Sequence, residues 1–143
     1  MYIIVNELDT VISQTISVTK KEMVLSVIRP YLYIHNINTG DLKVSIEKDA
    51  SEITSFTQTI TAIKAGLESD NTYYHGFIKF QLASPIRLSR GDYVIKLSGV
   101  NGYSFASDSF IGWVKEYEDR TNNVTSTISS LNSPHSVQLW SLI

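Results

Sequence analysis

The stretch FIKFQLASPIRLSRGDYVIKL, residues 77–97, decides the fold expected for this chain. Its two ends, Phe77–Leu82 and Tyr93–Leu97, are expected to be strands, and in the second every other residue is a large apolar or aromatic one, as in a strand with one buried face. Pro85 lacks an amide hydrogen and is expected to end one strand, while Gly91 allows a tight turn. The residues expected to point into the core are Tyr93, Ile95 and Leu97.

Alternation with a period of two recurs along most of the chain. Leu42, Val44 and Ile46 alternate with polar residues after a turn that contains Gly40, which predicts a half-buried strand. Val24–Ile37 is rich in β-branched and aromatic residues, and Pro30 within it indicates a bend or an edge position. Further strands are expected at Val11–Val18, Phe110–Tyr117 and Val137–Leu142.

One segment fits both a helix and a strand. A helical face is formed by Phe56, Ile60, Ile63 and Leu67. The β-branched threonines between them favour a strand instead. We expect a strand over Ser55–Ile63 that runs into a short helical turn ending near Gly66, with a helix through Glu68 as the alternative.

The length and composition predict one all-β domain. The 143 residues, 43% of them hydrophobic, are enough for a single core without disulfides, and the chain has no cysteine. Strands separated by turns predict an antiparallel β-sandwich over residues 1–143, jelly-roll-like, with at most one short helix. From Glu118 to Pro134 the chain is polar, which predicts a long loop of the kind that is often functional.

Charge and hydropathy narrow the range of partners. The net charge of −2 leaves no basic excess to neutralise phosphates, so nucleic acid is not expected as a partner. No apolar run approaches the ~18 residues of a membrane-spanning helix, so no membrane is expected either. Met1–Glu7 lacks the basic and long apolar regions of a signal peptide, which predicts synthesis in a host cytoplasm.

No group of residues predicts catalysis. His35, His75 and His135 lack the spacing of metal ligands, and nucleophile-elbow and phosphate-loop motifs are missing. We therefore expect neither an enzyme nor a cofactor. A structural calcium ion is a weaker alternative, because five acids lie in predicted loops: Asp41, Asp49, Glu52, Asp70 and Asp108.

Exposed aromatic rings are the best candidates for ligand contacts, since sugar rings stack on them. The candidates for glycan binding are Tyr73, Tyr74 and Tyr103, whereas Trp113 is expected in the core. Tyr73 and Tyr74 are adjacent and should face opposite sides of a strand. The tripeptide Arg90-Gly91-Asp92 matches an integrin-binding motif, but we interpret it as a strand-connecting turn.

Three stretches together carry a family resemblance. They are residues 57–63 (TQTITAI), 73–80 (YYHGFIKF) and 84–97 (SPIRLSRGDYVIKL). They resemble carbohydrate-binding-module-like jelly rolls, in which an aromatic-rich strand leads through a proline and a glycine turn into a tyrosine-containing strand. Such domains serve as glycan-binding modules and as structural or adhesive domains of bacteriophage particles. The resemblance implies a fold and does not identify a ligand.

The expected function is that of a structural component of a virus particle, of the bacteriophage kind. Capsid decoration, tail or fibre component and adaptor are the roles within this class, and contacts with copies of itself and with other virion proteins are its mechanism. The apolar termini are the expected interface, with Tyr2, Ile4, Trp140, Leu142 and Ile143. The alternative is a carbohydrate-binding module that attaches to host surface glycans.

Overall fold

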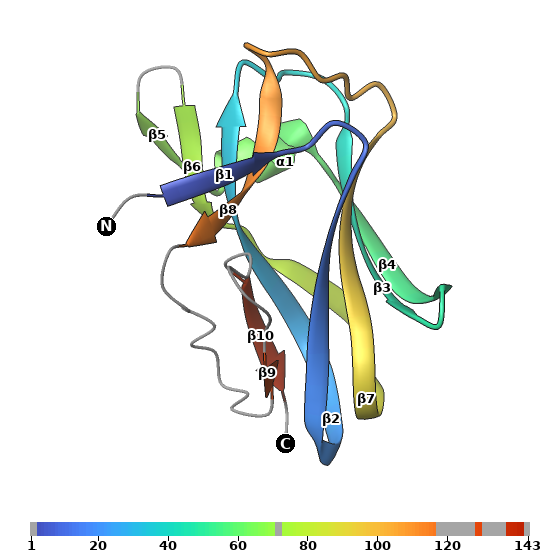
Figure 1. Ribbon diagram of the computed structural model, residues 1–143. Helices are drawn as coiled ribbons and strands as arrows, with labels where there is room; N and C mark the ends of the chain where they lie inside the picture. Colours follow the sequence, from blue (N-terminus) through green and yellow to red (C-terminus); the bar gives the residue numbers. More distant parts are fainter. Residues whose placement is uncertain (1–2, 71–72, 117–127, 130–136, 142–143) are drawn as a thin grey trace.

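The structure, a computed structural model, describes residues 3–70, 73–116, 128–129 and 137–141 (Figure 1). The elements follow in the order β1 (Ile3–Glu7), β2 (Val11–His35), β3 (Asp41–Lys48), β4 (Ser51–Thr59), α1 (Ile60–Ala65), β5 (Glu68–Asp70), β6 (Tyr73–Phe77), β7 (Phe80–Val100), β8 (Phe110–Glu116), β9 (Ile128–Ser129) and β10 (Val137–Ser141). Neighbouring strands pair antiparallel throughout these residues. The predicted all-β class with one short helix is confirmed.

A folded two-stranded ribbon organises the chain. Val11–Val18 of β2 pairs with residues 98–91 of β7, and residues 22–28 pair with residues 89–80. Figure 1 shows that both strands fold back at their lower end and return upward. The fold lies where the register shifts between Val18 and Glu22. A ribbon doubled back in this way gives two facing layers, as in a β-sandwich.

The remaining strands extend these two layers. In one layer, β4 pairs with β3 and β3 pairs with the second half of β7, which pairs with the first half of β2. In the other, β5 pairs with β6, and residues 31–35 of β2 lie between β6 and β8, which pairs with β1. β2 therefore belongs to both layers. Pro30 lies where it leaves β7 and joins β6 and β8, as expected of a residue that marks a bend.

Both layers contribute alternate residues to one core. Among the fully buried side chains are Ile16, Leu25, Ile28, Leu32, Leu42, Ile46, Phe80, Ile95, Leu97 and Trp113. The predicted core positions Tyr93, Ile95, Leu97 and Trp113 are confirmed, with exposed fractions of 2% or less.

The ambiguous segment is a strand followed by a helix. β4 ends at Thr59, four residues before the predicted end, because the Thr59 hydroxyl accepts a hydrogen bond from the Ala62 amide (3.1 Å) and caps α1. Gly66 ends the helix where predicted, and Ile60 and Ile63 are buried in the core. The alternative helix through Glu68 is wrong, since Glu68 begins β5.

Three predictions about the strands between Phe77 and Leu97 are also wrong. β7 runs through Pro85 and does not end there. The proline lies in a register shift in which residues 82–85 face a single residue of β2, so no hydrogen bond between the strands requires an amide hydrogen at this position. Arg90-Gly91-Asp92 likewise lies within β7 and does not connect two strands, because Gly91 remains paired with Val18. Gly91 has a positive φ (147°) and lies next to the register shift between Val18 and Glu22. The predicted strand Phe77–Leu82 is interrupted at Ile78 and Lys79.

The termini and the polar loop are described only in part. Tyr2, Leu142, Ile143 and His135 lie outside the described residues, as does most of the predicted loop 118–134, in which Ile128–Ser129 forms β9. Ile4 pairs with Lys115 and Trp140 with Val27, so β1 and β10 both belong to the sheets of this chain. The interface expected at the termini stays a prediction.

Replacing a buried isoleucine of the ribbon tests the two-layered core. Ile95 is fully buried and Ile53 in β4 is 44% exposed, so the same change to alanine removes very different contacts. We expect Ile95→Ala to lower the free energy of unfolding by about 2–5 kcal/mol and Ile53→Ala by less than about 0.5 kcal/mol. Urea unfolding followed by circular dichroism measures both changes in the free energy of unfolding. Equal losses of unfolding free energy in the two variants would contradict the two-layered core.

Candidate functional site

A row of half-buried rings, here called the aromatic face, covers the outer side of the layer that contains β6. Its members are Tyr31, Tyr33 and His35 of β2, Tyr73, His75 and Phe77 of β6, and Phe110 of β8. Side chains alternate along a strand, so these rings lie opposite the buried Leu32 and Ile34.

Pairing between the strands brings these rings into contact. Tyr31 is paired with Phe77, and their ring centroids lie 4.9 Å apart, edge to face. His35 is paired with Tyr73 and stacks on it at 4.7 Å, and Phe110 lies 5.7 Å from His35. Pairs of this kind contribute about 0.5–1.5 kcal/mol beyond the area that they bury. The rings are therefore held in place by their neighbours.

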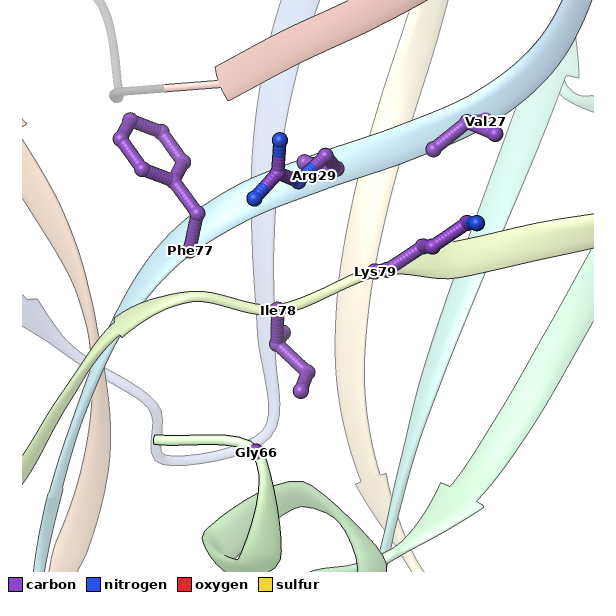
Figure 2. A pocket seen from close by; sticks show the side chains of 6 residues that line it. All are labelled: Val27, Arg29, Gly66, Phe77, Ile78 and Lys79. Atoms are coloured by element: carbon purple, nitrogen blue, oxygen red, sulfur yellow. The ribbon is translucent and has the colours of Figure 1, made fainter. Parts of the chain in front are cut away.

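Two adjoining cavities, here called the Arg29 groove, lie at the end of the aromatic face near Phe77. One has a volume of about 450 Å³ and is lined by Val27, Arg29, Gly66, Phe77, Ile78 and Lys79. The other, of about 320 Å³, shares Arg29, Gly66 and Phe77 and adds Tyr31, Glu68, His75 and Gly76. In Figure 2 the Arg29 guanidinium lies beside the Phe77 ring, while Ile78 points away from that ring toward Gly66.

The charge of Arg29 has no acidic partner within the described residues. Its guanidinium carbon lies 5.8 Å from the centre of the Phe77 ring, a cation–π contact. Its Nε is buried and has no hydrogen-bond partner in the described part of the chain. A buried donor without a partner costs about 1–3 kcal/mol. Because Arg29 also lines both cavities, its guanidinium group is a candidate for contact with a ligand.

The three tyrosines predicted to bind glycans are not brought together. Tyr73 belongs to the aromatic face, whereas Tyr74 points to the other side of β6, where the Lys64 ammonium lies 4.6 Å from its ring centre. Tyr103 packs against Gly40 and Gly99, where an added Cβ would collide with it. Of the three, the geometry leaves only Tyr73 in a row of outward-facing rings.

Tyr103 connects the segment before β2 to the start of β8 through its hydroxyl group. The hydroxyl donates to the Leu8 carbonyl (2.5 Å) and accepts from the Ile111 amide (3.0 Å). Burial raises the pKa of Tyr103, and the nearby carboxylates of Asp9 and Glu7 act in the same direction against the Ile111 hydrogen bond. The neutral hydroxyl thus joins the segments that precede β2 and open β8, which is a structural role.

Removing this hydroxyl tests that role. Tyr103→Phe leaves the Leu8 carbonyl and the Ile111 amide without their partner, so we expect a loss of about 1–3 kcal/mol in the free energy of unfolding. Tyr74→Phe is the matched control, because no hydrogen bond of the Tyr74 hydroxyl is seen in the described residues. Chemical denaturation of both variants measures the difference, and a Tyr103→Phe protein as stable as the control would refute the role.

The described residues show no clustered ligands for a metal ion. No group of three or more histidine, aspartate or glutamate side chains lies together within these residues. Of the acids considered for calcium, Asp41 accepts a hydrogen bond from Asn101 (2.7 Å) and Glu52 pairs with Lys43 (3.0 Å), while the side chain of Asp70 lies outside the description. In the same part of the chain, no helix is long and apolar enough to cross a membrane.

Sequence reasoning missed most of this site. Two sets of residues occupy every second position in the sequence: Arg29, Tyr31, Tyr33 and His35 form one set, and Tyr73, His75 and Phe77 form the other. That spacing alone places each set on one side of a strand. The sequence does not show that these two sets lie on neighbouring strands, which the pairing of β2 with β6 reveals.

Comparisons with known proteins identify no relative, because no family model, curated protein or solved structure matches the chain.

Proposed function

We propose that this protein is a non-enzymatic structural component of a virus particle, of the bacteriophage kind, that acts through contacts with copies of itself and with other particle proteins. The observation that supports this proposal best is the aromatic face, where seven half-buried rings lie side by side on three strands. Aromatic residues are enriched where protein surfaces meet. Residues 57–63, 73–80 and 84–97 also resemble carbohydrate-binding-module-like jelly rolls, which serve as structural domains of bacteriophage particles as well as glycan-binding modules.

The rigidity of the face favours protein contacts. Its rings are held by the pairing of β2 with β6 and β8 and by one another, so little side-chain freedom remains to be lost on association. Tyr31 is also fixed by its hydroxyl, which lies 3.1 Å from Nδ1 of His75. A pre-organised face of this kind suits a repeated contact within an assembly.

Carbohydrate binding is the second candidate. The Arg29 groove favours it, because a hollow beside the half-exposed rings of Phe77 and Tyr31 offers both a stacking surface and polar groups. A free-standing glycan-binding module would use this groove and would not need to self-associate.

Sedimentation velocity over a range of concentrations separates the two candidates. We expect the wild-type protein to self-associate and Tyr73→Ser, which removes a ring that contacts Tyr33 and His35, to shift it toward monomer by about tenfold or more in dissociation constant. Ile53→Ser is the control, since Ile53 is an exposed apolar residue of β4 that is not part of the face. A wild-type protein that stays monomeric and binds a glycan saturably would contradict the structural proposal.

A further inference from the structure

We propose that the Arg29 groove binds a sugar that carries a carboxylate, such as a uronic or sialic acid residue of an acidic glycan. This inference rests on the second candidate function, carbohydrate binding, and does not require the particle role.

Arg29 differs from several other cations of the described residues in having no acidic partner. Three other cations have acidic partners in the structure: Arg87 with Glu22 at 2.7 Å, Lys43 with Glu52 at 3.0 Å and Lys96 with Glu47 at 3.0 Å. Arg29 has no such partner in the described residues, and its Nε is buried without a hydrogen bond. Arg29 lines both cavities, and its planar guanidinium matches the two oxygens of a carboxylate, which supplies the missing negative charge.

An apolar surface lies beside that charge. The Phe77 ring lines both cavities, and Tyr31, in contact with it, lines one of them. A simple inorganic anion would use the guanidinium but leave these rings uncovered. A neutral sugar would cover the rings and offer hydroxyl oxygens as acceptors, but it would leave the positive charge of Arg29 without a negative partner. A carboxylated sugar ring satisfies both requirements at once.

The remaining groups of the Arg29 groove fit the same ligand. The Lys79 side chain adds a second positive charge to the larger cavity. Glu68 and His75 line the smaller cavity and provide acceptors and donors for sugar hydroxyls. The volumes of about 450 and 320 Å³ lie in the range of small-molecule sites, roughly 300–1,000 Å³.

Titration with defined sugars tests the proposal. The probes are 3′-sialyllactose and trigalacturonic acid, with lactose as the neutral control, each followed by calorimetry and by amide chemical shifts. We expect at least one acidic probe to bind about tenfold or more tightly than lactose and to shift the amides of Arg29, Phe77 and Lys79. The probe that binds distinguishes a sialic acid from a uronic acid.

Matched arginine variants identify the selecting group. We expect Arg29→Gln to weaken binding by about tenfold or more, and Arg29→Lys, which keeps the charge without the fork, to weaken it as well. Arg90→Gln removes one positive charge from an exposed residue of β7 outside the groove and should leave binding unchanged.

Three results would overturn the proposal: equal affinity for lactose, equal weakening by Arg29→Gln and Arg90→Gln, or absence of binding by both acids. If Arg29→Gln does not fold, the wild-type protein alone tests the proposal. In that case, amide chemical-shift changes on adding an acidic sugar that lie away from the Arg29 groove would overturn it. Self-association is measured without sugar, so a failure here is distinguishable from a failure of the proposed particle role.

Discussion

The pairing of β2 with β7, folded back on itself, is the interaction on which the rest of the structure depends. It places the first half of each strand against the second half of the other and so creates both layers of the sandwich. Cysteine is absent from the chain, so no disulfide holds the layers together. Their stability comes from the apolar side chains that the folded ribbon buries, such as Ile16, Leu25 and Ile95.

The same ribbon positions the candidate site. Beyond Pro30, β2 separates from β7 and continues between β6 and β8, so that its outward-facing rings meet those of two further strands. Arg29 lies just before this change of partner, next to the gap between β6 and β7 where Ile78 and Lys79 leave the ladder. The Arg29 groove is thus a consequence of how one strand moves from one sheet to the other.

Much of the fold follows from local sequence rules, and the errors have a common cause. Alternation at Leu42, Val44 and Ile46 predicted β3, and alternation at Tyr93, Ile95 and Leu97 predicted buried positions. Pro85 and Gly91 were expected to break the chain into separate strands, because local rules consider only what one residue permits. A bulge accommodates a proline and a folded ribbon accommodates a glycine with positive φ, and both depend on the partner strand.

The candidate site was less predictable than the fold. Tyr73 was expected to contact a ligand and lies in the aromatic face, but its contacts with Tyr33 and His35 join segments about forty residues apart in sequence. Tyr103 has the same residue type, yet its hydroxyl is occupied by Leu8 and Ile111. Residue type and spacing indicate which tyrosines are candidates for such a site. The pairing of strands decides which of these tyrosines belong to it.

Native-state hydrogen exchange of the β2 and β7 amides tests the central claim most directly, because it reports on each half of the folded ribbon separately. If the ribbon unites the two layers, the paired amides of residues 11–18 and 91–98 should open with the same free energy as those of residues 22–28 and 80–89, equal to the free energy of global unfolding. Two distinct opening free energies, one for each half, would contradict this account.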